Sequence, residues 1–207
     1  MGLFDFFKPK KKSGLAGVSD DPLVRKGILA MQLQYVKQEV SNLKAVGREH
    51  DANKRATNYL QECLQEWKIE PSNPSHITRL ANAAMSLDLS QFGEESLQIV
   101  IEANEKSPFM DLTRVYTDLG RIYHQLGSDK EKELWAYQMA TQCESPPKCK
   151  FPATSADKAT AHDFAYNCAL VMVKHEHAKH HDQMRRKLVP DLDCDDMMAV
   201  VQWIRNK

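Results

Sequence analysis

Apolar residues recur along most of this chain at the three- and four-residue spacing of amphipathic helices. The clearest stretch runs from Ile77 to Ala140, where two helix-turn-helix units follow one another. We place the turn of the first unit at Gly93 and that of the second at Gly127, and Pro108 and Pro146 close the two units. Their apolar faces consist of Leu80, Ala83, Ala84, Leu87, Val100 and Ala103, then Tyr116, Leu119, Tyr123, Trp135, Tyr137 and Ala140. Since one such pair cannot bury its apolar face alone, the pattern predicts that the pairs stack on each other.

Further helices are predicted on both sides of these units. The first begins at Asp21-Pro22 and carries one apolar stripe, and the second runs from about Asp51 to Lys68. We interpret the stripe as core, with self-association as the alternative; it consists of Leu29, Leu33, Val36, Val40 and Leu43. A proline-rich segment at 144–156 precedes one long predicted helix, 156–188, and a final amphipathic helix spans 193–205. The expected fold is all-α, a right-handed stack of antiparallel helix pairs with flanking helices, over residues 21–207.

Capping residues support the predicted helix boundaries. Asn73 precedes Pro74 and can cap the first helix of the tandem units, and Asp111 can cap the third. Ser128 and Glu131 have the spacing of a capping box, in which each side chain bonds to the other's exposed backbone donor. These signals predict four short helices between residues 74 and 146.

The tandem units resemble tetratricopeptide repeats, a family of stacked helix pairs of about 34 residues. The matching positions are Tyr116, Leu119, Gly120, Tyr123, Tyr137, Ala140 and Pro146 in the second unit and Leu80, Ala84, Leu87, Ser96, Ala103 and Pro108 in the first. The resemblance covers residues 77–146, about a third of the chain. It implies that the first helix of each pair lines a concave face that binds protein or peptide. The inward positions would then be Thr78, Asn82, Met85 and Asp88, then Arg114, Thr117, Asp118, Arg121 and Gln125.

Among these positions, Asn82, Met85, Arg114, Asp118, Arg121 and Gln125 are our candidate partner-binding residues. Arg114 and Arg121 are seven residues apart, hence on one side of a helix, and fixed guanidinium groups suit an extended peptide or a carboxylate. Asp118 stands where the chaperone-tail-binding branch of the family has a basic residue. The alternative interpretation is an ordinary ion-pair ladder formed by Arg114, Asp118 and Arg121.

Composition narrows the function classes. Lys plus Arg and Asp plus Glu both number 28, so no net charge favours nucleic-acid binding. The five cysteines form no Cys-x-x-Cys pair, a usage typical of a reduced, cytoplasmic protein. No apolar run approaches the length of a membrane span. We expect no cofactor, and the sequence does not set the oligomeric state.

Residues 1–20 form a predicted tail and linker with a distinct composition. An apolar cluster is followed directly by a cationic one, and the two consist of Leu3, Phe4, Phe6 and Phe7, then Lys8, Lys10, Lys11 and Lys12. Apolar anchors beside a basic cluster predict peripheral contact with an anionic membrane, on the cytoplasmic side. The alternatives are a mobile tail or phenylalanines that dock on the helical body.

Two groups of residues that contain histidine raise the possibility of metal binding. His177 and His181 are four apart, as are the positions of Glu176 and His180, and such pairs can share a metal; we favour a solvated helix end because no third ligand is evident. The doublet His162-Asp163 suggests an all-helical metal-dependent phosphohydrolase, with His124 and Asp191 as further ligands. We therefore expect a non-catalytic adaptor with no bound metal, and the hydrolase is the alternative.

Overall fold

The computed structural model describes the backbone of residues 22–190 and the side chains of residues 31–190, and no strand occurs in this part of the chain. Its helices are α1 (Pro22–Ala45), α2 (Glu49–Ile69), α3 (Pro74–Ser86), α4 (Ser90–Lys106), α5 (Thr113–Gln125), α6 (Lys130–Gln142), α7 (Ser155–Val171) and α8 (His175–Leu188). The all-α prediction is thus confirmed for the described residues.

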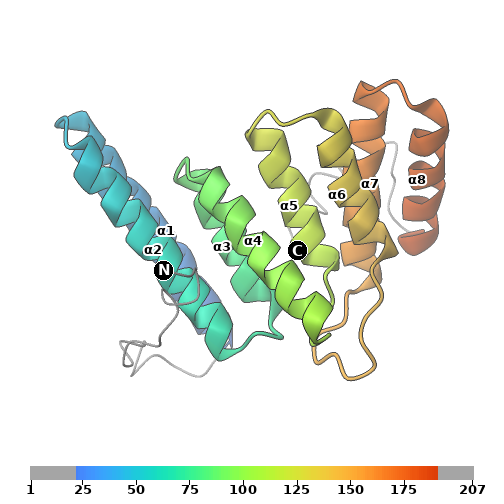
Figure 1. The fold of residues 1–207 in the computed structure, drawn as a ribbon, viewed down its shortest axis with the longest axis horizontal. Helices are drawn as coiled ribbons and strands as arrows, with labels where there is room; N and C mark the ends of the chain where they lie inside the picture. The colour runs from blue at the N-terminus through green and yellow to red at the C-terminus, as the bar shows by residue number, and fades with distance from the viewer. Residues whose placement is uncertain (1–21, 191–207) are drawn as a thin grey trace.

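Consecutive helices form hairpins that lie side by side in chain order, from α1–α2 at one end of the molecule to α7–α8 at the other (Figure 1). Each helix contacts the next along the chain. In addition, α3 contacts α5, and α5 contacts α7. No comparably extensive contact joins α4 to α6 or α6 to α8 within residues 22–190. Helices α3, α5 and α7 therefore form one continuous layer, which we call the layer of odd-numbered helices.

The larger of two apolar clusters among the described residues extends from α1 into α7. The stripe predicted on the first helix contributes to it, since Val36 and Val40 are buried and Leu33 and Leu43 pack against the cluster. Its largest fully enclosed side chains include Leu60, Ile77, Leu80, Leu97, Leu119, Ile122 and Tyr123. A second cluster, centred on Leu134 and Tyr137, joins α6 to α7 and α8. The two clusters connect neighbouring helices through buried apolar contacts.

The position predicted for the first tandem turn is wrong. The turn comprises residues 87–89, where Asp88 adopts a φ of 58°, and Gly93 instead lies inside α4. A Cβ atom at Gly93 would come within 2.9 Å of both the Ala84 Cβ and the Ile122 Cδ1. Gly93 therefore serves close packing of α4 on α3 and α5, whereas Gly127, with a φ of 64°, lies in the second turn as expected.

Gly120 permits the closest helix approach in the second unit. A Cβ atom there would overlap three atoms of the buried Tyr137 ring, which belongs to α6. The ring of Tyr137 in turn stacks on Phe164 of α7, with centroids 5.3 Å apart. The small residue at 120 thus admits a large aromatic group that links three helices.

The prediction of one long helix over 156–188 is also wrong, because this stretch forms two helices, α7 and α8. Val173 adopts a φ of 59° at the break, a conformation that costs a β-branched residue energy. The backbone N–H groups of Val173 and Lys174 donate to the carbonyl oxygens of Leu170 and Ala169 and close the end of α7. The chain therefore reverses and forms a fourth hairpin.

Some of the predicted helix-capping residues are confirmed by the structure, and others are not. Asn73 caps α3, since its Oδ1 accepts from the Ser75 N–H, and Asp111 accepts from the Thr113 N–H at the start of α5. The capping box predicted for Ser128 and Glu131 is wrong: Asp129 caps α6 by accepting from the Glu131 N–H. The structure has its capping box at α7, between Thr154 and Asp157.

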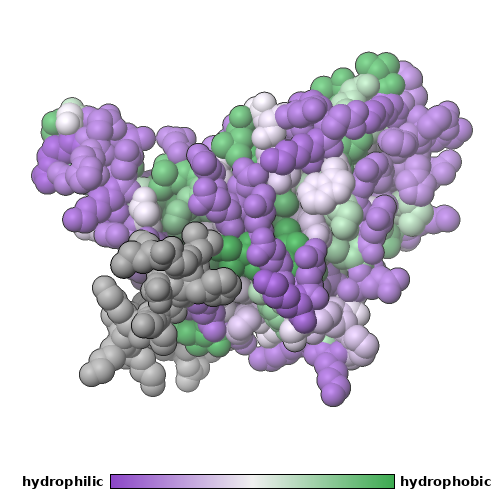
Figure 2. Space-filling model, viewed as in Figure 1, coloured by the Kyte–Doolittle hydropathy of each residue, from purple (hydrophilic) through white to green (hydrophobic). Residues whose placement is uncertain are grey.

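Several predictions lie outside the described residues. They concern the tail and linker at 1–20, the side chain of Leu29, the candidate ligand Asp191 and the helix at 193–205. Within the described part, no helix has both the length and the apolar character that crossing a lipid bilayer requires. Figure 2 shows a largely hydrophilic surface on the face in view, with hydrophobic surface over the α7–α8 turn, where Leu170, Val171 and Val173 are exposed.

Candidate partner-binding surface

The six candidate binding residues all lie on α3 and α5, in the layer of odd-numbered helices. Asn82, Met85, Arg114 and Arg121 are half-buried, Gln125 is exposed, and Asp118 is buried. The structure thus brings the candidates onto adjacent helices. It also shows that several of them bind other parts of the chain.

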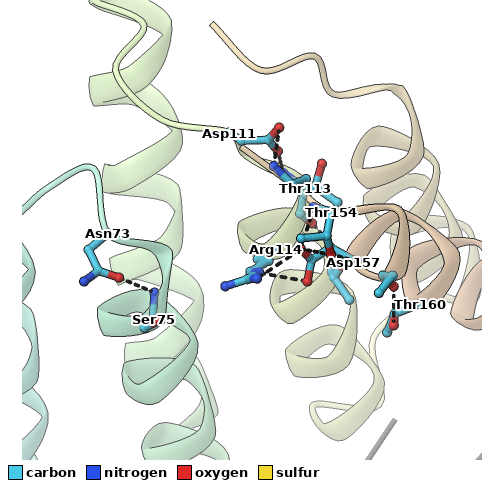
Figure 3. Close-up of polar contacts among 11 residues, drawn as sticks. Asn73, Ser75, Asp111, Thr113, Arg114, Thr154, Asp157 and Thr160 are labelled. Carbon is cyan, nitrogen blue, oxygen red and sulfur yellow. Dashed lines mark hydrogen bonds and ion pairs between the residues drawn. The ribbon is translucent and has the colours of Figure 1, made fainter. Parts of the chain in front are cut away.

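Arg114 makes a two-pronged ion pair with Asp157 of α7. Its Nε donates to Asp157 Oδ1 at 2.9 Å, and its Nη2 donates to Oδ2 at 3.0 Å (Figure 3). Burial alone would raise the pKa of Asp157, but hydrogen bonds from Arg114 and Thr154 outweigh it and hold the pKa below its ordinary value. Arg114 therefore joins α5 to α7, and the predicted ladder of Arg114 with Asp118 does not form.

Asp118 and Arg121 form an ion pair within α5. The Arg121 Nη1 donates to Asp118 Oδ1 at 2.8 Å, and Asp118 is only 3% exposed. Burial raises the pKa of Asp118, while Arg121 and the nearby Thr78 hydroxyl oppose that rise. Asp118 thus positions Arg121, whose side chain is 35% exposed and has further N–H donors to offer.

Gln125 and Met85 join α5 to α3 near the turns of their hairpins. The Gln125 Nε2 donates to the backbone carbonyl oxygen of Met85 at 2.8 Å. This carbonyl belongs to the last turn of α3, where carbonyl groups lack partners within the helix. Asn82 lies one turn earlier on α3 and is half-buried. Arg114 is bound to α7 and Asp118 is buried, so four candidates remain: Asn82, Met85, Arg121 and Gln125. We call these four residues the α3–α5 surface.

No protein-family model matches the sequence, and no curated protein matches it significantly. The tetratricopeptide resemblance therefore rests on the quoted residues, and it stays a prediction.

The residues nominated for a phosphohydrolase make other contacts. The Nδ1 atom of His124 lies 3.2 Å from a carboxylate oxygen of Glu133, which also accepts from Lys130. Asp163 forms a buried ion pair with Arg185 of α8. Within the described residues, no three or more His, Cys, Asp or Glu side chains are arranged to hold a metal ion. Because Asp163 is already neutralised by Arg185, its pairing gives the hydrolase interpretation no support.

The pairing of His177 with His181 that the sequence suggested is wrong, because His181 pairs with His162. His181 is buried and faces His162 across the α7–α8 interface, with their Nδ1 atoms 2.9 Å apart, while His177 is exposed. Such a bond needs a proton on one Nδ1 and a free lone pair on the other. Burial lowers the pKa of both imidazoles to about 4, and the neighbouring His180 contributes. The pair is therefore neutral near pH 7.

Sequence reasoning identified Asp111 only as a helix cap, but it also anchors the loop at 143–154. Asp111 Oδ2 accepts from the Ser145 hydroxyl and from the Ala153 N–H, while Oδ1 binds the start of α5. Burial opposes ionisation, yet these hydrogen bonds hold the pKa of Asp111 below its ordinary value. Proline-rich composition indicated the loop but gave no sign of this anchor.

Proposed function

We propose that the protein is a non-catalytic adaptor that binds a protein or peptide partner through the α3–α5 surface. The observation that carries the proposal is the fixed placement of polar groups on two adjacent helices. Arg121 is held by Asp118, and Gln125 is held by the end of α3. Side chains that are ordered before binding lose less conformational entropy when a partner arrives, so this arrangement favours recognition.

The chemistry of the surface favours a partner with a carboxylate or backbone carbonyl groups. Arg121 keeps donors beyond the one used by Asp118, and a guanidinium binds carboxylates in defined directions. Asn82 supplies both a donor and acceptors, and Met85 adds an adaptable apolar contact. The tetratricopeptide resemblance supports the same face, because the first helix of each repeat binds ligands in that family.

Affinity capture from a cell extract tests the proposal with matched variants. One variant combines Asn82→Ala, Arg121→Ala and Gln125→Ala, and the control combines Gln98→Ala with Glu102→Ala on exposed positions of α4. We expect the first variant to lose the proteins that the native chain captures and the control to retain them. Equal capture by both variants, with helical content unchanged, would contradict binding at the α3–α5 surface.

A further inference from the structure

The α1–α2 hairpin carries an uncovered groove. Its cavity of about 410 Å³ is lined by Met31, Gln32, Tyr35 and Val36 of α1 and by Arg55, Tyr59 and Glu62 of α2. Met31 and Tyr35 are 65% and 64% exposed, and their four-residue spacing puts them on one face of α1. The groove thus combines two large, exposed apolar side chains with the polar groups of Gln32, Arg55 and Glu62, a lining that suits a ligand with both apolar and charged groups.

The layer of odd-numbered helices explains why this groove is open. Helix α3 packs on α5, and α5 packs on α7, whereas α1 makes its extensive contacts within the described residues with α2 alone. Among the helices that the structure describes, α1 therefore has no second neighbour with extensive contacts of the kind that helps to bury the apolar side chains of α3 and α5. The groove between α1 and α2 is available to another segment.

We propose that residues 3–7, Leu-Phe-Asp-Phe-Phe, dock in the α1–α2 groove of the same chain. Four of these five residues are apolar, and three are aromatic, which suits the methionine, tyrosine and valine side chains that make up the apolar part of the cavity lining. This segment lies just ahead of α1 in the sequence. It supplies an apolar ligand for the groove without a second molecule.

The connecting chain is long enough for this docking. Phe7 precedes Pro22 by 15 residues, which span up to roughly 50 Å when extended. Met31 lies nine residues into α1, roughly 14 Å along the helix axis from its start. A tether of this length gives an effective concentration of about a millimolar, so even weak contacts suffice. Helix α8 lies at the opposite end of the row of helices from α1 (Figure 1).

The charges around the groove complement the segment. Arg55 lines the cavity, where its Nε donates to Glu39 at 2.7 Å, and Glu62 lies two turns further along α2. Asp5 lies between Phe4 and Phe6, so it can approach Arg55, while the lysines that begin at Lys8 can approach Glu62. Because docking buries the phenylalanines that a membrane would bind, the docked state and the membrane-bound state exclude each other.

Hydroxyl-radical footprinting of the full-length chain tests the docking. A variant with Phe4→Ala, Phe6→Ala and Phe7→Ala removes the apolar groups, and a matched control with Lys10→Ala, Lys11→Ala and Lys12→Ala keeps them. We expect Met31 and Tyr35 to oxidise severalfold faster in the phenylalanine variant than in the native chain, and the control to resemble the native chain. Trp135, which is exposed on α6, should oxidise equally in all three proteins and serves as the internal reference.

Three results would overturn the proposal. Equal oxidation of Met31 and Tyr35 in the native and phenylalanine variants would show that the segment does not cover the groove. Protection that disappears when the protein is diluted would assign the groove to a second copy of the chain. Protection that appears only with vesicles containing anionic lipid would assign the phenylalanines to a membrane. A cross-link within one chain, from p-benzoylphenylalanine at position 6 to the peptide that contains Met31, would support docking independently.

Discussion

The hairpins α3–α4 and α5–α6 differ from α7–α8 in what holds their helices together. The first two are joined by apolar side chains and by close approach at Gly93 and Gly120. The α7–α8 interface has apolar contacts too, but it also encloses the pair His162–His181 and the ion pair Asp163–Arg185. The α7–α8 hairpin therefore depends on the protonation state of a buried histidine pair and on a buried ion pair that joins its two helices.

Removing Arg185 should expose this difference most strongly. Arg185→Met leaves the Asp163 carboxyl buried without its guanidinium partner, and breaking such a pair costs about 3–5 kcal/mol. We expect a loss of that size in the free energy of unfolding, measured by chemical denaturation. Arg186→Met is the matched control, because the side chain of Arg186 is 43% exposed and pairs with Asp182 at the surface. Equal losses in both variants would contradict a special role for the buried pair.

Filling the space at Gly120 should reduce the free energy of unfolding by less, because it disturbs apolar packing and leaves no buried charge unpaired. Gly120→Ala forces the Tyr137 ring to move, and overpacking outweighs the gain in helix propensity, so we expect a loss of about 1–2 kcal/mol. The same change in a Tyr137→Leu background should cost less, because the ring is absent. Additive losses from the two substitutions, measured by thermal or chemical unfolding, would show that the ring and the glycine do not interact.

Acid should weaken the α7–α8 hairpin before the other hairpins. The pKa of His162 and His181 is about 4 in the folded chain and about 6.5 when unfolded, so the unfolded chain binds more protons between these values. Stability from the neutral pair is therefore complete above pH 6.5 and is lost as the pH falls toward 4. Groups that face the pair are Lys158, His177 and His180.

Hydrogen exchange of α8 amides from pH 7 to pH 4.5, corrected for intrinsic rates, measures this loss. The native chain should lose protection in α8 relative to α5 as the pH falls. A His162→Gln, His181→Gln variant should show a shallower pH dependence, since it has no imidazole to protonate at this interface. The same slope in both proteins would contradict the assignment to this pair.

Removing Arg114 should have the smallest effect on stability. The Arg114–Asp157 pair is partly exposed, with the Arg114 side chain 37% accessible, and such pairs contribute about 1 kcal/mol or less. We expect Arg114→Ala to reduce the free energy of unfolding by no more than this. Asp157→Ala should cost more, because it also removes the capping box with Thr154. A larger loss in Arg114→Ala than in Asp157→Ala would contradict this ranking.

Local periodicity was enough to predict the helices from α3 to α6, since their apolar residues recur at helical spacing and Asn73, Pro74 and Gly127 mark their ends. The break between α7 and α8 was not predictable in this way. It contains neither glycine nor proline, and Val173 adopts a backbone conformation that glycine usually occupies. The turn predicted at Gly93 is wrong for the opposite reason: this glycine lies inside α4, where its small size allows close packing against α3 and α5.

The candidate surface was predictable as a set of helix positions but not as a set of contacts. Arg114 and Asp157 are 43 residues apart, and nothing in the sequence near Arg114 indicates the pairing. The burial of Asp118 likewise follows from the packing of α5, which a short charge pattern does not report. Sequence spacing thus gave the face of each helix, while the tertiary structure decided which side chains remain accessible.

Photo-cross-linking of a captured partner tests binding at the α3–α5 surface most directly. A photoreactive amino acid replaces Met85 or Gln125 in two proteins and Gln98 or Glu102, on α4, in two others. Binding at the α3–α5 surface predicts partner cross-links from positions 85 and 125 and none from 98 and 102. Cross-links from the α4 positions alone would contradict it.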